Sequence, residues 1–306
     1  MGTSKSKTAG SPATREGFIR VLLRPHNRGL VLTGIVVLAS IGFALYAWQR
    51  WGEPATHTAE YLVTAERISV TAQPTWIHSN VKDEVVRSLA GAKLELLDRD
   101  LVEQVAQAFA LHPWVANVLR VEKRFPAQVN VELEYRQPVI VVKIDAPGEE
   151  GLLFLDEESV LLPSADFAPS QAKGYLRIMA AGETPTSVYG TPWGSERMLG
   201  AARVAAAWGD RWQTLGLYWI MGTRPSSGQL VYELRTQNDQ VRVVWGVAPG
   251  HESADEASPL QKITALEQYV NDKGPLEKSG AGAVVDLRKL ADGALKTAGG
   301  SKSRRR

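Results

Sequence analysis

An uncharged apolar segment near the N-terminus is the feature that most constrains this chain. It covers residues 30–48, LVLTGIVVLASIGFALYAW, which are 19 residues without a charged side chain. As an α-helix rising about 1.5 Å per residue, it would span roughly 28 Å, close to the hydrocarbon thickness of a bilayer. Tyr46, Trp48 and Trp51 mark one end, and such rings favour the membrane interface. The segment therefore predicts a transmembrane helix over residues 30–48.

Two other interpretations of this segment compete with a membrane anchor. A buried helix of a soluble protein is usually shorter and has a polar face. A cleaved signal peptide has a shorter apolar core and small residues at its exit, whereas this segment leads into Tyr-Ala-Trp-Gln-Arg-Trp. The sequence therefore favours an uncleaved anchor.

The charged residues around the segment predict its orientation. Glu16 is the single acid before it, against six basic residues, Lys5, Lys7, Arg15, Arg20, Arg24 and Arg28. Basic and acidic residues are nearly balanced in the stretch that follows. The positive-inside rule therefore places the N-terminus in the cytoplasm and the remaining body, about 250 residues, outside it. We expect residues 1–29 to form a disordered basic tail and residues 49–66 to form a linker.

The composition excludes several classes of function. The 306 residues contain no cysteine, which excludes disulfide scaffolds, thiol catalysis, and zinc or iron–sulfur sites built on cysteine. With 35 basic and 33 acidic residues, the net charge is +2, so no global basic field favours nucleic acid. The five histidines are scattered without metal-ligand spacing. We therefore predict no metal site and no cofactor.

A small domain of helices and strands is predicted over residues 67–144. A strand begins at Ile68, and Ser79 or Asn80 is suited to cap a first helix. Asp100 and Glu103 have the spacing of a capping box at the start of a second helix.

Two strands follow the helices in this domain. The second of them, residues 128–135, alternates strictly between apolar and polar side chains and is typical of a half-buried strand. The first covers residues 117–124, and a third apolar run follows Pro138 at residues 139–144. The expected order is strand, helix, helix, strand, strand, with both helices on one face of a small sheet.

The segment HPWVANVLRVEKRFPAQVNVELEYRQPVIVV resembles the POTRA module of the FtsQ/DivIB family of bacterial cell-division proteins. The family has an adjacent Glu-Arg pair at the strand exit, and Tyr135 separates that pair here. The resemblance implies a βααββ POTRA domain. Its motif positions are Trp114, Arg124, Pro126, Glu134, Arg136 and Pro138.

A second, β-rich domain with flanking helices is predicted over residues 150–290. It begins with a hairpin at residues 151–163, and residues 291–306 predict a disordered basic tail. Between them, strands are expected at 175–179, 215–221, 229–235, 240–246 and 283–288, and helices at 195–208 and 259–270.

The second half also resembles the FtsQ/DivIB family, because a terminal VDLR strand follows a helix that contains Lys262 and Leu266. The resemblance implies that FtsB/DivIC-like and FtsL-like single-pass coiled-coil proteins bind the end of this domain. Lys289 replaces an aromatic residue of many relatives. The implied partner-binding residues are Val284, Val285, Asp286, Leu287 and Arg288. From the residues alone, this strand could be either an exposed edge or a protected internal strand.

Candidate catalytic groups are absent from the sequence pattern. Asp156, Glu157 and Glu158 are adjacent acids, which predict a solvated turn rather than a carboxylate site. Glu132 and Glu134 share the face of a strand that should be wet, whereas a catalytic acid usually needs burial. We therefore predict no catalytic residue and no enzyme.

The sequence as a whole predicts an α+β protein with one transmembrane helix at the inner membrane, N-terminus in the cytoplasm and body in the periplasm or outside the cell. The resemblance implies a scaffold of the divisome at the septum. The alternatives are a POTRA-containing protein of outer-membrane assembly or secretion, and a membrane-anchored envelope enzyme. The first usually carries tandem POTRA modules and a β-barrel, whose alternating segments we do not find. The second needs a polar cluster that the pattern lacks.

Overall fold

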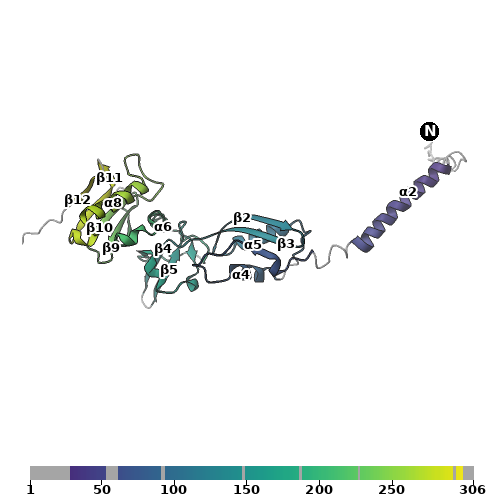
Figure 1. The fold of residues 1–306 in the computed structure, drawn as a ribbon, viewed down its shortest axis with the longest axis horizontal. Helices are drawn as coiled ribbons and strands as arrows, with labels where there is room; N and C mark the ends of the chain where they lie inside the picture. Colours follow the sequence, from purple (N-terminus) through teal and green to yellow (C-terminus); the bar gives the residue numbers. More distant parts are fainter. Residues whose placement is uncertain are drawn as a thin grey trace, which may run out of the picture.

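The protein is a mixed α+β chain with one apolar helix near its N-terminus and a sheet-rich body (Figure 1). The computed structural model describes residues 28–52, 61–90, 94–146, 149–185, 188–226, 228–291 and 294–298. Residues 1–27 of the predicted N-terminal tail, residues 53–60 of the predicted linker and residues 299–306 lie outside this described part.

The apolar helix α2, Arg28–Ala47, continues into a short turn, η1, Trp48–Gly52. It is the one helix in the described residues that is long and apolar enough to cross a membrane. The hydroxyls of Thr33 and Ser40 donate to backbone oxygens one turn earlier, each at 2.8 Å, so they leave no free donor in an apolar surrounding. The helix is not buried against the body, which contradicts the interpretation as a soluble core helix.

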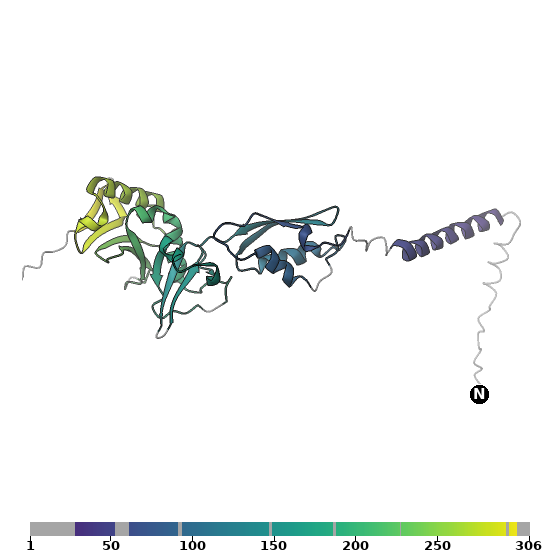
Figure 2. The same cartoon turned by 60° about the horizontal axis from the view of Figure 1, so that its bottom comes forward.

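We call residues 61–136 the small unit, in which two helices cover one face of a three-stranded sheet (Figures 1 and 2). The sheet order is β1-β3-β2, with β1 parallel and β2 antiparallel to β3. The elements are β1 Ile68–Val70, α4 Val81–Ser88, α5 Leu101–Ala110, β2 Val115–Arg124 and β3 Gln128–Tyr135. The predicted order of these five elements is confirmed.

The core of the small unit follows from the spacing of its apolar residues. Alternate residues of β3 point at the helices and are buried, while their neighbours are not. The helices contribute residues three and four apart, which lie on one helical face. The buried residues from these elements include Val81, Val85, Leu101, Val105, Phe109, Val129, Val131 and Leu133.

The two helix starts of the small unit differ. Asn80 caps α4 as predicted, and its Oδ1 accepts from the backbone N–H of Asp83 at 3.0 Å. Asp100 occupies the N-cap position of α5, but its side chain makes no capping hydrogen bond, so the predicted capping box is wrong. The backbone of Asp100 is already helical, with φ −89° and ψ −5°, and Asp98 accepts from its N–H instead.

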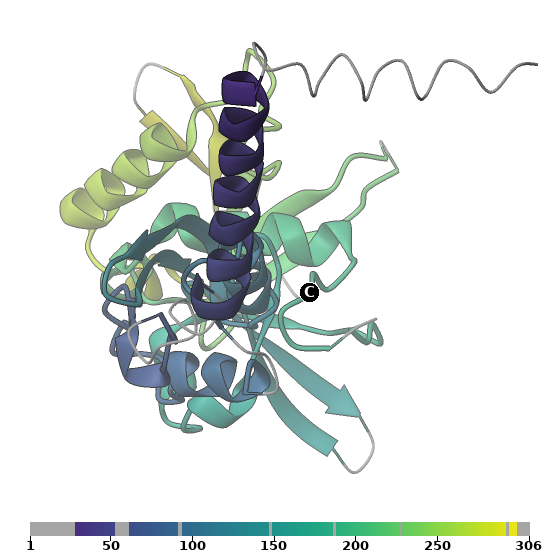
Figure 3. The same cartoon turned by 90° about the vertical axis from the view of Figure 1, so that its right-hand side faces the viewer.

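We call residues 139–298 the large unit, a nine-stranded sheet with helices α6 and α8 packed over one core. Its order is β12-β11-β10-β9-β8-β7-β4-β5-β6, and β4 and β5 project as a hairpin (Figure 3). The strands are β4 Ile140–Ala146, β5 Glu149–Leu155, β6 Leu161–Leu162, β7 Leu176–Met179, β8 Leu217–Thr223, β9 Val231–Thr236, β10 Val241–Gly246, β11 Ala283–Ala291 and β12 Ala294–Ala298. The helices are α6 Glu196–Trp208, α7 Arg211–Thr214 and α8 Pro259–Lys273, with short 3-10 turns including η3 Ser164–Asp166 and η4 Gln171–Gly174.

The structure places two predicted segments differently from the sequence. The run at residues 139–144, predicted as part of the small domain, forms β4 and pairs with β5 and β7 of the large sheet. Ile140, Val141 and Val142 are all buried, as expected for a strand covered on both faces. Strand β12 lies within residues 291–306, for which the sequence predicts a disordered tail.

Candidate partner-binding site and unit junction

The predicted partner-binding residues lie on β11 and alternate between its two faces. Val285 and Leu287 are completely buried in the core beneath α8, whereas Arg288 is exposed. Val284 and Asp286 are half-buried on the opposite face of the sheet. These five residues therefore do not form one continuous surface, and at most three of their side chains are accessible.

Strand β11 is an internal strand of the described sheet. It pairs in parallel with β10 on one side and antiparallel with β12 on the other. The backbone of β12 lies opposite Val284, Val285 and Asp286. Of the two positions that the sequence leaves open, the structure therefore shows the internal one, and the end of the described sheet is β12.

The outer face of β11 carries a charged pair, Asp286 and Arg288. The Arg288 guanidinium donates to both carboxylate oxygens of Asp286, at distances from 2.6 to 3.2 Å. Burial opposes ionisation of Asp286, but the hydrogen bonds from Arg288 outweigh it and hold the pKa of Asp286 below its usual range. The same pairing raises the pKa of Arg288.

A buried lysine connects α8 to the loop beside this strand. The Lys262 side chain has no exposed surface, and its Nζ lies 2.6 Å from Glu256 Oε1 and 4.8 Å from the ring centre of Trp245. The same carboxylate oxygen accepts from the Val247 N–H, and the Ala257 N–H donates to the Arg288 carbonyl. The ion pair between Lys262 and Glu256 therefore helps to hold the loop that bonds to β11 at Arg288. The sequence signal was a lone lysine beside the apolar positions of an amphipathic helix.

The predicted POTRA-motif residues separate into two groups. Trp114 and Arg136 meet at the end of the small unit, where the Arg136 N–H donates to the Trp114 carbonyl at 2.9 Å. Arg124 and Pro126 lie at the opposite end of the unit, around the turn between β2 and β3. Glu134 lies on the exposed face of β3 and accepts from Asn117, while Pro138 is buried in the connection to β4.

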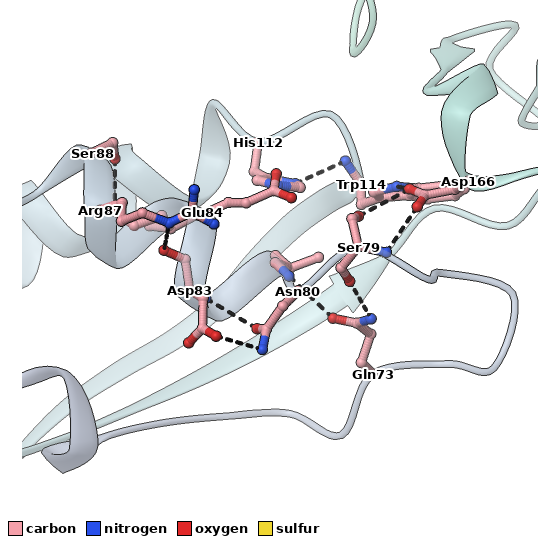
Figure 4. Close-up of polar contacts among 12 residues, drawn as sticks. Gln73, Ser79, Asn80, Asp83, Glu84, Arg87, Ser88, His112, Trp114 and Asp166 are labelled. Carbon is pink, nitrogen blue, oxygen red and sulfur yellow. Dashed lines mark hydrogen bonds and ion pairs between the residues drawn. The ribbon is translucent and has the colours of Figure 1, made fainter.

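A carboxylate of the large unit joins the two units (Figure 4). Asp166, in η3, is 8% exposed and accepts three hydrogen bonds from the small unit. The donors are the Ser79 N–H at 2.8 Å, the Ser79 hydroxyl at 2.9 Å and the Trp114 indole N–H at 2.5 Å. Sequence reasoning missed Asp166, because an acid in a loop rich in proline and serine resembles a solvated residue.

A second carboxylate at the junction corrects the prediction for the acidic turn. Glu157 and Glu158 are exposed as predicted, but Asp156 is buried and forms an ion pair with Arg136 at 2.6 Å. Burial raises the pKa of Asp156, with Glu158 acting in the same direction, and these effects exceed the opposing influence of Arg136 and the Val160 N–H. Asp156 is buried because Arg136 and the Val160 backbone satisfy both of its oxygens.

A cleft of about 910 Å³ opens between the two units beside this ion pair. Its walls come from β3, the β5–β6 turn, and the segments around α6 and α7. Trp76, Tyr135, Tyr175 and Trp212 contribute aromatic surface to it.

Among the described residues, no group of three or more His, Asp or Glu side chains gathers as a metal site would require. His112 follows α5, with its Nε2 3.1 Å from Glu84 Oε2 and its Nδ1 accepting from the Trp114 N–H. The imidazole of His112 therefore connects α4 to the segment that contains Trp114.

No family model matches the chain, and no curated protein matches it.

Proposed function

We propose that this chain is a single-pass scaffold of the bacterial divisome, of FtsQ/DivIB type, that works by binding partners and not by catalysis. In this proposal the helix α2 anchors the protein in the inner membrane, with the N-terminus in the cytoplasm. The small unit is a POTRA domain, and the large unit presents its C-terminal sheet end to FtsB/DivIC-like and FtsL-like single-pass coiled-coil proteins at the division site.

The observation that carries this proposal is the order of parts along the chain. An apolar helix precedes a unit with the order β, α, α, β, β, and a larger sheet that includes the VDLR segment follows. Figure 2 shows these parts arranged in that order along an elongated molecule. A single short helix or a single small sheet occurs in many proteins, so the co-linear arrangement is more informative than any one part.

Strand addition at the end of the large sheet is the binding mode that we propose. An unpaired strand edge offers N–H and C=O groups to an extended partner segment. Because β12 covers β11, a partner strand either pairs with the outer edge of β12 or takes its place beside Val284, Val285 and Asp286. Arg288 and Lys289, both exposed, lie where they can contact acidic side chains of the partner in either case.

The test is a tagged pull-down of the full chain from detergent-solubilised native membranes, identified by mass spectrometry. Recovery of small single-pass coiled-coil proteins and septal wall synthases supports the scaffold. Arg288→Glu should reduce their recovery, because it reverses an exposed charge at the proposed site. Arg224→Glu is the matched control and should bind normally, because Arg224 follows β8, three strands away from β11, is similarly exposed and also pairs with a carboxylate, that of Glu196.

A charged residue or proline in place of Leu287 would disrupt β11, but this substitution is not a suitable test of the binding site. Its side chain is completely buried in the core of the large unit, so a loss of binding would reflect misfolding. Normal recovery with Arg288→Glu would contradict the site. Recovery of outer-membrane barrels and lipoproteins instead of division proteins would contradict the scaffold and favour a role in outer-membrane assembly.

The orientation in the membrane has a separate test. Moving the basic residues from before Leu30 to after Trp48 should disturb topology, because the positive-inside rule depends on that asymmetry. Protease accessibility of the body in spheroplasts measures the outcome. An unchanged pattern would contradict the proposed orientation.

A further inference from the structure

We infer that Asp166 is a latch that makes the small and large units one rigid body. Two units joined by a short connection are expected to move relative to each other unless a substantial interface prevents it. The contacts between the two units form an interface that restricts their relative motion. The inference does not depend on the proposed function, because it concerns only how the two units are held.

The latch carboxylate receives donors from two separate parts of the small unit. Ser79 precedes α4 and Trp114 precedes β2, and both donate to Asp166. The structure gives Asp166 no cationic partner within its described residues, so these three donors compensate its charge. If the large unit rotated away from Ser79 or Trp114, the hydrogen bond from that residue to Asp166 would break. The donor would then be unpaired, and the buried carboxylate would have less to compensate its charge.

Aromatic rings continue the contact into the large unit. The ring of Trp114 lies 5.7 Å from that of Phe167, which is the residue after the latch. Phe167 stacks on Phe154 of β5 at 3.7 Å, and Phe154 meets Tyr175 edge-on at 5.5 Å. Trp114 and Phe154 therefore belong to one continuous core that crosses from one unit to the other.

The chain crosses between the units at a different point from the latch. Arg136 ends the small unit and forms its ion pair with Asp156 of the large unit, and Trp76 donates to the Arg136 carbonyl at 3.1 Å. Two bodies held at one point can rotate freely, whereas a second contact leaves only rotation about the line between them. The aromatic column beside the latch blocks that remaining rotation, because such rings are closely packed.

Distance measurements between spin labels on the two units test this inference directly. The chain has no cysteine, so Leu119→Cys on β2 and Leu260→Cys on α8 would be the sole attachment points. Both leucines are about 63% exposed, so labels there should leave the cores intact. The full chain in lipid nanodiscs should give one narrow distance distribution.

Asp166→Asn should broaden that distribution at least about two-fold, because an amide places its own donors against those of Ser79 and Trp114. Ser79→Ala, which removes one hydroxyl donor, should broaden it less. Asp239→Asn is the matched control, since it changes an exposed carboxylate in the turn between β9 and β10. It should leave the distribution narrow.

Two results would overturn the inference. One is a broad distribution in the unmodified chain, which would show that the units already move. The other is an unchanged distribution in both Asp166→Asn and Ser79→Ala, which would show that the latch does not set their orientation. Circular dichroism of each variant guards against global unfolding, and if Asp166→Asn fails to fold, the result with Ser79→Ala decides.

Discussion

We expect Lys262→Met to destabilise the large unit by about 3–5 kcal/mol, because it leaves a buried carboxylate without its cation. Lys262 is completely buried, and its Nζ lies 2.6 Å from Glu256, whose side chain is 11% exposed. Methionine is similar in length and apolar volume, so the cavity contribution is small. The expected loss of stability is therefore mainly electrostatic. It includes the loss of the cation–π contact between Lys262 and the Trp245 ring.

Thermal and urea unfolding of the full chain in nanodiscs, followed by tryptophan fluorescence, measures this loss. For a unit of this size, the expected change corresponds to a melting temperature lower by roughly 6–20 °C. Lys273→Met is the matched control, since Lys273 lies at the exposed C-terminal end of the same helix. It should change stability by no more than about 0.5 kcal/mol.

The double variant Lys262→Met with Glu256→Gln separates the charge from the packing. Removing both charges leaves no unpaired carboxylate. A protein in which a buried ion pair is replaced by neutral residues is often as stable as the original protein. The double variant should therefore recover most of the stability that Lys262→Met loses. A loss below about 1 kcal/mol in Lys262→Met, or a double variant as unstable as the single one, would refute the reasoning.

Three further predictions concern packing and pH. Gly200→Ala should destabilise α6 by about 1–3 kcal/mol in urea unfolding, although alanine usually favours a helix, because an added Cβ would collide with the buried Tyr232 hydroxyl. Gly246→Ala should lower the melting temperature, because φ is +100° and the Cβ would collide with the Glu256 carboxylate. Asp156 has a raised pKa, so its contribution to stability is largest below its ordinary value of 3.8 and is lost as pH rises through the raised value. The unfolding free energy of the unmodified chain, relative to that of Asp156→Asn, should therefore fall as pH rises above 3.8, and an increase with pH would contradict the sign.

Local pattern was sufficient to predict most of the elements. The alternation in residues 128–135 gave β3 and its buried face, because a strand's period fixes which side chains point together. Asn80 gave the start of α4, because its side chain bonds only to a neighbour three residues away. Such features depend on interactions within a few residues, which the sequence displays directly.

The assignment of β4 could not be made from the same pattern. A short apolar run fits an edge of the small sheet as well as the centre of the large one. Its place is decided by pairing with Leu176–Met179, which lie 36 residues further along the chain. The same limit applies to β11, whose internal position depends on β12.

The burial of Asp156 shows why the candidate site was only partly predictable. Three adjacent acids predict a solvated turn, and two of them are solvated. The third is buried because Arg136, 20 residues earlier, reaches it from the other unit. Asp166 is even harder to predict, because Trp114 and Ser79, which donate hydrogen bonds to it, lie 52 and 87 residues earlier in the chain.

The junction buries two carboxylates, Asp156 and Asp166. Asp156 forms a buried ion pair with Arg136, and replacing such a pair with apolar residues is often neutral or stabilising, so the pair is weak evidence for a need for stability. Apolar contacts have little directional preference, and the column of Trp114, Phe167 and Phe154 alone would permit small shifts between the units. Hydrogen bonds to Asp166 weaken steeply when their geometry changes, so they select one orientation. In the membrane-anchored scaffold that we propose, one orientation would fix where the distal end of the large sheet lies relative to the small unit.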